Sequence, residues 1–288
     1  MLSYIHAYHA GNHADILKHI TFSLVLEHLT KKEKPFCIID THAASGFYHI
    51  NDERILKTEE SKNGIEKLIT ALEKTEKNYP SLSSSRYIQI AASYLKNGLY
   101  PGSPEIARIF LRQSDHLILN ELHPQTVKEL KANIKNPPLI QNNENNSPQI
   151  SVHQRDAWEF ILSAVPPKIK RGCVIIDPSY EDEDDFQKTA QNVVSAYKKW
   201  RTGIFLVWYP LLPHKKAEIQ FLKNTLIEET CSFSPKEKNW ADFSLEVKKE
   251  ESLTGLAKLY GSGMFVINPP FGLEEKINCI LPELKMIL

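Results

Sequence analysis

The sequence predicts an α/β protein with a Rossmann-like, mostly parallel sheet of seven strands, and three observations carry this prediction. Short apolar runs alternate with segments in which apolar residues recur at helical spacing. A small-residue loop, residues 41–46, follows the first run. Four runs end in an acidic residue, at Asp40, Glu121, Asp156 and Asp177. Because ligands of open α/β sheets bind outside the carboxyl ends of the strands, these acids mark the predicted binding edge.

The composition is that of a globular protein, with 42% apolar and 24% charged residues among 288. The 35 basic and 35 acidic residues balance, so a nucleic acid would have to be met by local basic patches. The four cysteines are far apart, which favours free thiols over disulfides or a zinc site. There is no signal-peptide core and no transmembrane-length segment, so we expect a cytoplasmic protein without a membrane partner.

The first thirty residues predict a helix preceded by a histidine-rich segment. Apolar residues recur at helical spacing over residues 12–31, which predicts an amphipathic helix with Asn12 as its cap. His6, His9, His13 and His19 raise the question of a metal site. The pattern is not HExxH and only Asp15 joins the histidines, so we expect no metal and favour contacts to RNA or a cofactor.

A charged, helical stretch at residues 48–99 separates the first strand from the second. It predicts a small helical insertion subdomain, with helices near 64–77 and 85–96. The Rossmann-like domain would then comprise residues 1–47 and 100–288. After the insertion, a rigid loop at 100–104 opens a helix over 105–112, with Ser103 as its expected cap.

The loop after the first strand (36–40) resembles the first motif of class I S-adenosylmethionine methyltransferases, D-x-x-x-G-x-G. Gly46 is retained and Ala44 replaces the other glycine; small residues let the loop backbone approach a cofactor. Glu121 ends the second strand (116–121), where an acid binds ribose hydroxyls in Rossmann-like folds. Asp156, before a helix over 157–165, suits either the amino group of the cofactor's adenine or the helix cap.

The fourth strand, 173–177, delivers Asp177, Pro178, Ser179 and Tyr180. This run resembles the [DNS]-P-P-[YFW] motif of enzymes that methylate exocyclic amino groups. The Asp177 carboxylate and the Pro178 carbonyl can hold both N–H bonds of such an amine, and Tyr180 is expected to stack on the flipped base. Asn268-Pro-Pro-Phe271 matches the motif better by letter, but it follows the last strand. Because the motif belongs after strand four, beside the cofactor loop, we favour Asp177.

The remaining strands and helices are predicted from the same patterns, and one charged segment is less clear. Strands are expected at 203–208, 230–234 and 263–267, and helices at 124–135, 183–200, 213–229 and 273–286. The charged segment, 236–249, suits a strand and a loop. The acids at 181–185 could bind Mg²⁺ but favour the start of the next helix. Basic clusters at 168–171 and 198–201 are expected near the active edge, where they would contact phosphates.

With this order established, the chain resembles the bacterial J-type 23S rRNA adenine-N6-methyltransferases. The resemblance covers nearly the whole chain and is most specific in the first nineteen residues. It is carried by MLSYxHxxHAGNHADxLKH, DTHAASGFY, YPGSP, NELHP, IIDPSY, WYP and SGMFVINPP. It implies a monomeric class I methyltransferase with a helical insert that transfers a methyl group from S-adenosylmethionine to N6 of one adenine of 23S rRNA.

The resemblance also implies site residues. Asp177 matches the position that binds cofactor and target and accepts a proton, and Tyr4 matches a substrate-contacting position. Ala44, Ser45, Ala157 and Ser179 depart from the family pattern. Cofactor contacts are implied for His19, His42, Ser103, Glu121, Asp156 and Ala157.

Two other functions fit parts of the sequence. A DNA adenine methyltransferase would share the site, but it usually needs a larger target-recognition domain than an insert of roughly fifty residues. An inactive, methyltransferase-like RNA-binding protein would explain the altered glycine loop and Ser179. Binding of S-adenosylmethionine and a preference for rRNA over DNA distinguish the three.

Overall fold

The computed structural model describes residues 4–139, 148–231, 238–248 and 259–288. Its centre is a seven-stranded sheet in the order β5-β4-β1-β6-β7-β9-β8. The first five of these strands pair in parallel, and β9 is antiparallel to both β7 and β8. The strands are β1 (Cys37–Asp40), β4 (His116–Asn120), β5 (Gln149–His153), β6 (Gly172–Ile176), β7 (Ile204–Leu211), β8 (Trp240–Glu246) and β9 (Gly261–Ile267). The predicted Rossmann-like α/β class is confirmed.

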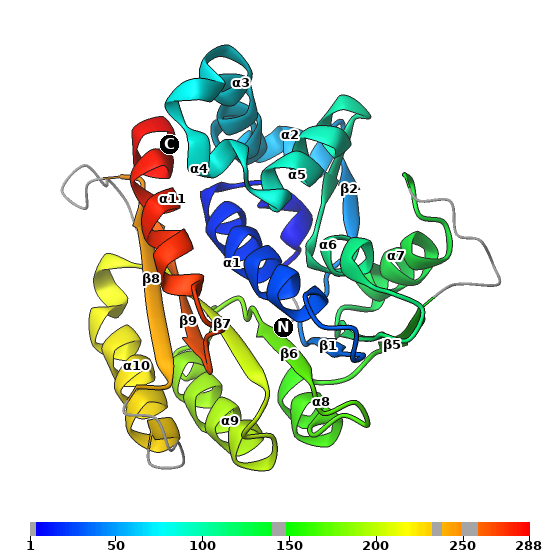
Figure 1. The fold of residues 1–288 in the computed structure, drawn as a ribbon, viewed down its shortest axis with the longest axis vertical. Helices are drawn as coiled ribbons and strands as arrows, with labels where there is room; N and C mark the ends of the chain where they lie inside the picture. The colour runs from blue at the N-terminus through cyan, green and yellow to red at the C-terminus, as the bar shows by residue number, and fades with distance from the viewer. Residues whose placement is uncertain (1–3, 140–147, 232–237, 249–258) are drawn as a thin grey trace.

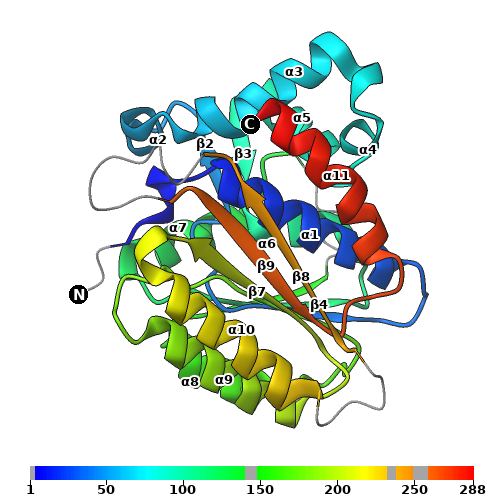
Figure 2. The ribbon, with the colours of Figure 1, turned by 90° about the vertical axis from the view of Figure 1, so that its left-hand side faces the viewer.

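Helices cover both faces of the sheet, which therefore forms the middle of three layers (Figures 1 and 2). One face carries α1 (His13–Thr30), α6 (Ser103–Phe110) and α11 (Leu273–Ile287), and the other carries α8 (Ala157–Ala164), α9 (Asp185–Lys199) and α10 (Lys216–Cys231). Helix α7 (Pro124–Lys135) links β4 to β5. None of the described helices is both long and apolar enough to cross a membrane.

Helix α1 begins where the sequence predicted, but its environment differs from the prediction. Asn12 caps it, because its side chain accepts hydrogen bonds from the N–H groups of Ala14 and Asp15. The helix is not amphipathic: it is enclosed between the sheet and the insertion, and most of its residues are buried on every side. Asp15, Lys18 and His19 are buried with the apolar residues. The predicted amphipathic character of this helix was therefore wrong, because polar side chains are buried along with the apolar ones.

The segment between β1 and α6 is mostly helical and packs on α1 and α11 (Figure 1). It comprises α2 (Glu53–Thr58), a π-helical turn (Lys62–Glu66), α3 (Lys67–Thr75), α4 (Pro80–Ser83) and α5 (Arg86–Lys96). At its boundaries, β2 (Phe47–His49) and β3 (Leu99–Pro101) pair as a two-stranded antiparallel sheet. Its apolar residues share one core cluster with α1, so the division at residues 48–99 stays a prediction.

Two local predictions were wrong. The strand expected at 230–234 is not present in the described part of that segment, since Thr230 and Cys231 end helix α10 and residues 232–237 lie outside the described ranges. The sixth strand is instead β8, in the charged segment, where Ala241, Phe243 and Leu245 alternate toward the core. Ser103 is the first residue of α6, and Gly102 occupies the cap position.

Candidate active site

A cavity of about 510 Å³ opens at the carboxyl ends of β1, β4 and β6. It collects almost every residue that the sequence singled out, although these residues come from six separate stretches of the chain. The predicted residues that line it are Tyr4, His19, His42, Ser103, Glu121, Asp156, Ala157, Asp177 and Pro178. Lys18, which the sequence reasoning missed, lines it as well.

Asp177 is held by a buried ion-pair network that reaches helix α1. Lys18 Nζ lies 2.5 Å from Asp177 Oδ2 and 2.7 Å from Asp15 Oδ1. Asp15 also accepts hydrogen bonds from Gly11 N and lies 3.2 Å from His6 Nε2. The neighbouring Lys18 and His6 hold the pKa of Asp15 well below its usual range despite burial. The two carboxylates likewise raise the pKa of Lys18 against the opposing effect of burial, so the site keeps one buried ammonium.

His42 connects the first loop to the fourth strand. Its Nδ1 accepts a hydrogen bond from Asp177 N at 3.3 Å and lies 2.8 Å from Thr41 Oγ1. Burial lowers the pKa of His42 to about 4, so the ring is neutral at pH 7 and can accept this bond. The cofactor loop thereby fixes the backbone from which Asp177 projects, which the sequence did not indicate.

The structure does not place Tyr180 in the cavity. Its ring is buried, 4.3 Å from the ring of Phe186 between centroids, and its hydroxyl donates to Trp208 O. Tyr180 also has a positive φ of 53°, an uncommon conformation for an aromatic residue. Core packing and the hydrogen bond of its hydroxyl hold the Tyr180 ring, so in this conformation it does not face a base. The predicted stacking of Tyr180 on a base is therefore contradicted. Tyr180 instead anchors the loop that carries Asp177, Pro178 and Ser179.

Glu121 and Asp156 both lie at the cavity wall with part of their hydrogen-bonding capacity in use. The two oxygens of Glu121 accept from Ala44 N and His123 N, at 2.9 Å and 2.7 Å. Asp156 Oδ1 accepts from Trp158 N and Glu159 N and thus caps helix α8. The capping interpretation of Asp156 is confirmed. The second oxygen of Asp156 has no hydrogen-bond partner among the described residues, so one acceptor remains for a ligand.

Asp40 lies beneath the first loop and is almost completely buried. Ser103 Oγ donates to Asp40 Oδ2 at 2.7 Å, and His42 N donates to Asp40 Oδ1. Burial raises the pKa of Asp40 to about 7, against the effect of these two hydrogen bonds. Ser103 is thereby fixed at the cavity wall by Asp40, the acid that opens the resembled D-x-x-x-G-x-G motif.

The histidine-rich N-terminus closes another side of the cavity. Tyr4 is 38% exposed, its hydroxyl lies 3.0 Å from His6 Nδ1, and its ring stacks on His9. His19 Nδ1 lies 3.0 Å from the hydroxyl of Tyr100, and its Nε2 has no partner among the described residues. Burial lowers the pKa of His19 to about 3, so this ring is neutral.

The competing motif and the charged clusters lie elsewhere. The Asn268 side chain donates to the carbonyls of Arg201 and Gly203, before the start of β7, because β9 runs antiparallel and ends at the opposite edge of the sheet. Residues 168–171 and 198–201 precede β6 and β7, so both basic clusters also lie at that opposite edge. Their expected position near the active edge was wrong. The acids Asp184 and Asp185 begin helix α9, as favoured.

Comparison with known proteins agrees with this geometry. The family model described as "Ribosomal RNA large subunit methyltransferase D, RlmJ" matches residues 33–288. The Ribosomal RNA large subunit methyltransferase J of Escherichia coli strain K12 is 35% identical, over 99% of this chain and 93% of that protein. The protein of the same name from Haemophilus influenzae is 34% identical, over 100% of this chain and 94% of its own.

A solved structure extends the match to three dimensions. The crystal structure of protein LPL1258 from Legionella pneumophila superposes with a TM-score of 0.79 at 30% identity, covering 97% of this chain and 94% of that one. Fold, cavity and sequence therefore agree, and the resemblance found in the sequence is confirmed. The chain belongs to the RlmJ family of ribosomal RNA large subunit methyltransferases.

Proposed function

We propose that this protein transfers a methyl group from S-adenosylmethionine to N6 of an adenine in 23S rRNA, acting as a cytoplasmic monomer. The family membership supports the reaction class and the methyl donor. The observation that carries the proposal is the position of Asp177, which lies in one cavity with Glu121, Asp156 and the small-residue loop. An acceptor for an exocyclic amine is thereby next to the residues expected to hold the cofactor.

The residues around the cavity fit S-adenosylmethionine. When bound, this cofactor supplies an electrophilic methyl group on a positively charged sulfur. Glu121 would accept from ribose hydroxyls, and Asp156, through its unoccupied oxygen, would accept from the amino group of the cofactor's adenine. His19, His42 and Ser103 complete the wall, and each ring or hydroxyl is held by a contact beneath it.

Asp177 and Pro178 would orient the target amine. The nitrogen of an exocyclic amine is a poor nucleophile, because its lone pair is delocalised into the ring. Accepting both N–H bonds, at the carboxylate and at the Pro178 carbonyl, leaves that lone pair directed at the methyl carbon. As N6 bonded to the methyl carbon, the bond from that carbon to sulfur would break and S-adenosylhomocysteine would leave; Asp177 would take the proton that N6 loses. Lys18 holds Asp177 Oδ2 in place, so positioning is the main contribution of the protein.

Tyr4 takes the aromatic role that the buried Tyr180 cannot fill. Tyr4 is a partly exposed aromatic residue on the N-terminal side of the cavity, and stacking on His9 fixes the orientation of its ring. A base extruded from RNA needs such a surface, because it loses its own stacking partners on entry. Tyr4 is therefore the proposed contact to the target adenine.

Methyl transfer from labelled S-adenosylmethionine tests this function. We expect label in unmodified 23S rRNA, recovered as N6-methyladenosine, and none in duplex DNA. Label in DNA but not in rRNA would favour a DNA adenine methyltransferase. Failure to bind S-adenosylmethionine in calorimetry would favour an inactive RNA-binding protein.

A further inference from the structure

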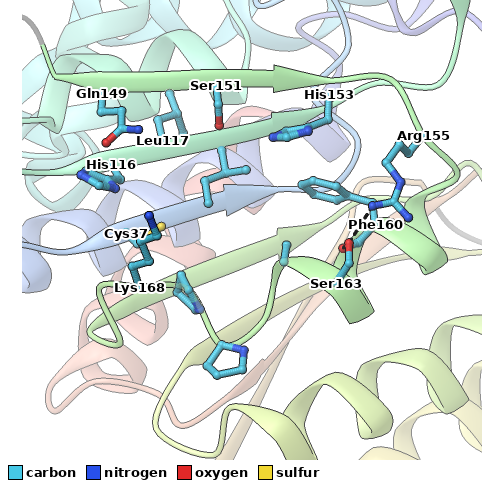
Figure 3. Close-up of a pocket in the computed structure, with 14 residues that line it drawn as sticks. Cys37, His116, Leu117, Gln149, Ser151, His153, Arg155, Phe160, Ser163 and Lys168 are labelled. Carbon is cyan, nitrogen blue, oxygen red and sulfur yellow. Dashed lines mark hydrogen bonds between the residues drawn. The ribbon is translucent and has the colours of Figure 1, made fainter.

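A second cavity of about 380 Å³ lies on the face of the sheet opposite helix α1, over β1, β4 and β5. Figure 3 shows side chains from these strands and from helix α8 turned toward a common space. Gln149, Ser151 and His153 line it from alternate positions of β5, which puts the three on one face of the strand. Strand β5 is the edge strand of the sheet, so this cavity is open at the side of the molecule.

The two cavities are neighbours. Arg155 lines the sheet-face cavity, and the next residue, Asp156, lines the catalytic cavity. Helix α8, which Asp156 caps, contributes Phe160 and Ser163 to the sheet-face cavity and Ala157 and Trp158 to the catalytic one. Residues 155 and 156 and helix α8 therefore form a wall that the two cavities share.

The two cavities differ in the charged residues that line them. The described residues that line the catalytic cavity include Glu121, Asp156, Asp177 and the exposed Glu181 and Asp182. Those that line the sheet-face cavity include no aspartate or glutamate, and a permanent cation stands at each end of it. Arg155 lies at the carboxyl ends of the strands and Lys168 at the amino ends (Figure 3). The RNA backbone needs cationic contacts. Among the described residues that line the catalytic cavity, Lys18 is the only lysine or arginine, and it is buried and already paired with Asp15 and Asp177.

Lys168 belongs to one of the two predicted basic clusters, and three other cations of these clusters are already engaged with protein groups. Arg171 donates to the carbonyls of Lys34 and Leu29, Lys198 pairs with Glu229, and Lys199 donates to Leu162 O. Arg155 is 45% exposed at its side chain, donates to Ser163 Oγ at 2.8 Å, and has only a 3.9 Å ion pair with an exposed glutamate. Its guanidinium thus keeps donors for a phosphate.

The part of the cavity next to Arg155 suits a base (Figure 3). His153 is exposed, and its ring lies beside the buried ring of Phe160, with centroids 5.4 Å apart and planes tilted by 40°. This contact orients an exposed aromatic ring on which a base can stack. Gln149 offers an amide donor and acceptor, and Ser151 offers a hydroxyl, on the same face of the strand. Unstacked RNA bases are recognised by this combination of an aromatic face and edge-directed hydrogen bonds.

We propose that the sheet-face cavity binds a second, unmethylated nucleotide of the RNA substrate, on the strand that flanks the target adenine. Its base stacks on His153 within reach of Ser151, and the phosphate beside it pairs with Arg155. The RNA strand continues along β5 past Gln149, so that a later phosphate pairs with Lys168. Strand β5 has five residues and is roughly 15 Å long, which matches two or three nucleotides of extended RNA. This inference rests on the proposed rRNA methyltransferase function.

The test compares RNA affinity with catalysis in the full-length protein. The probe is a fluorescein-labelled 23S rRNA fragment that contains the target adenine and its flanks, titrated in anisotropy at several salt concentrations. His153→Ala should raise Kd roughly fivefold to a hundredfold, as loss of one base-stacking contact does. Arg155→Ala/Lys168→Ala should reduce the salt slope by about 1.4, since each single-strand phosphate contact contributes about 0.7.

Matched controls separate this proposal from a general loss of charge or of function. Lys276→Ala/Lys285→Ala removes two cations from helix α11, on the other face of the sheet, and should leave Kd and salt slope unchanged. The cavity variants should keep their affinity for S-adenosylmethionine and their methylation rate at saturating RNA, so that only KM for RNA rises. If the wild type methylates the RNA and the cavity variants keep its Kd and salt slope, the second site is refuted. If the wild type does not methylate the RNA, the proposed function fails instead.

Discussion

Replacement of Lys18 by methionine removes the ammonium that joins Asp15 to Asp177. Lys18 and Asp15 are only 5% and 1% exposed at their side chains, so the variant leaves a carboxylate in the interior without its cation. Breaking a buried ion pair costs about 3–5 kcal/mol. Asp15 keeps its contacts to Gly11 N and His6, so we expect a loss of stability near about 3 kcal/mol, at the low end of that range.

The same change should slow methyl transfer. Asp177 Oδ2 loses the contact that fixes its direction, and a displacement near 1 Å costs about a hundredfold in rate. Urea unfolding measures the stability, and single-turnover methylation at saturating RNA and S-adenosylmethionine measures the rate. Lys31→Met, at the exposed end of the same helix, is the control and should change the free energy of unfolding by less than about 0.5 kcal/mol.

A double variant separates the two effects. Asp15→Asn/Lys18→Met removes both members of the buried pair and should recover part of the stability, since no unpaired charge is left at Asp15. It should not recover the rate, because Asp177 still lacks its ammonium. A folded Lys18→Met protein with the wild-type single-turnover rate would show that this network has no positioning role.

Three further outcomes follow from the same geometry. Asp177→Ala should abolish methylation without unfolding the protein. Retained activity would mean that the catalytic residue is not the one that follows β6. Glu121→Ala should weaken S-adenosylmethionine binding about tenfold to a hundredfold by calorimetry, as one lost charged hydrogen bond does, with an unchanged RNA Kd; an unaltered cofactor Kd would exclude the ribose role. Ser179→Pro should keep cofactor affinity and an equal or modestly higher single-turnover rate, whereas a large loss would give the Ser179 hydroxyl its own role.

Burial of His19 predicts a pH dependence of stability. The folded protein holds His19 neutral down to about pH 3, whereas the unfolded chain binds its proton below about pH 6.5. The unfolded state therefore binds more protons in this window, and stability is lost as the pH falls through it. His19→Leu should reduce the slope of unfolding free energy against pH by about 1.4 kcal/mol per unit between pH 6 and 4. An identical slope in the variant would mean that His19 is solvated.

The sequence predicted those parts of the fold that depend on interactions between residues close together in the chain. The Asn12 cap, the strand-ending acids and the proline after Asp177 each act within a few residues, and the elements they bound were found. β8 lies in the charged segment that suited a strand and a loop, and its period-two pattern at Ala241, Phe243 and Leu245 would have fixed its bounds.

Long-range pairing explains what the sequence did not predict. Lys18 has the appearance of a solvated residue on a helix face, but its role depends on Asp177, 159 positions away. Tyr180 occupies the aromatic position of the motif, but its ring is fixed in the core. Phe186 of α9 and the carbonyl of Trp208 in β7 hold it there. Such roles depend on which elements enclose a side chain, and one sequence does not encode this in a local pattern.

The most direct test of the central claim is nucleoside mass spectrometry of 23S rRNA methylated by the purified protein. The starting material is rRNA from a strain that lacks the gene, incubated with wild-type or Asp177→Ala protein and S-adenosylmethionine. We predict one new N6-methyladenosine with the wild type and none with the variant. Equal modification by both proteins, or no modification by either, would contradict the assignment of this cavity as an rRNA adenine methylation site.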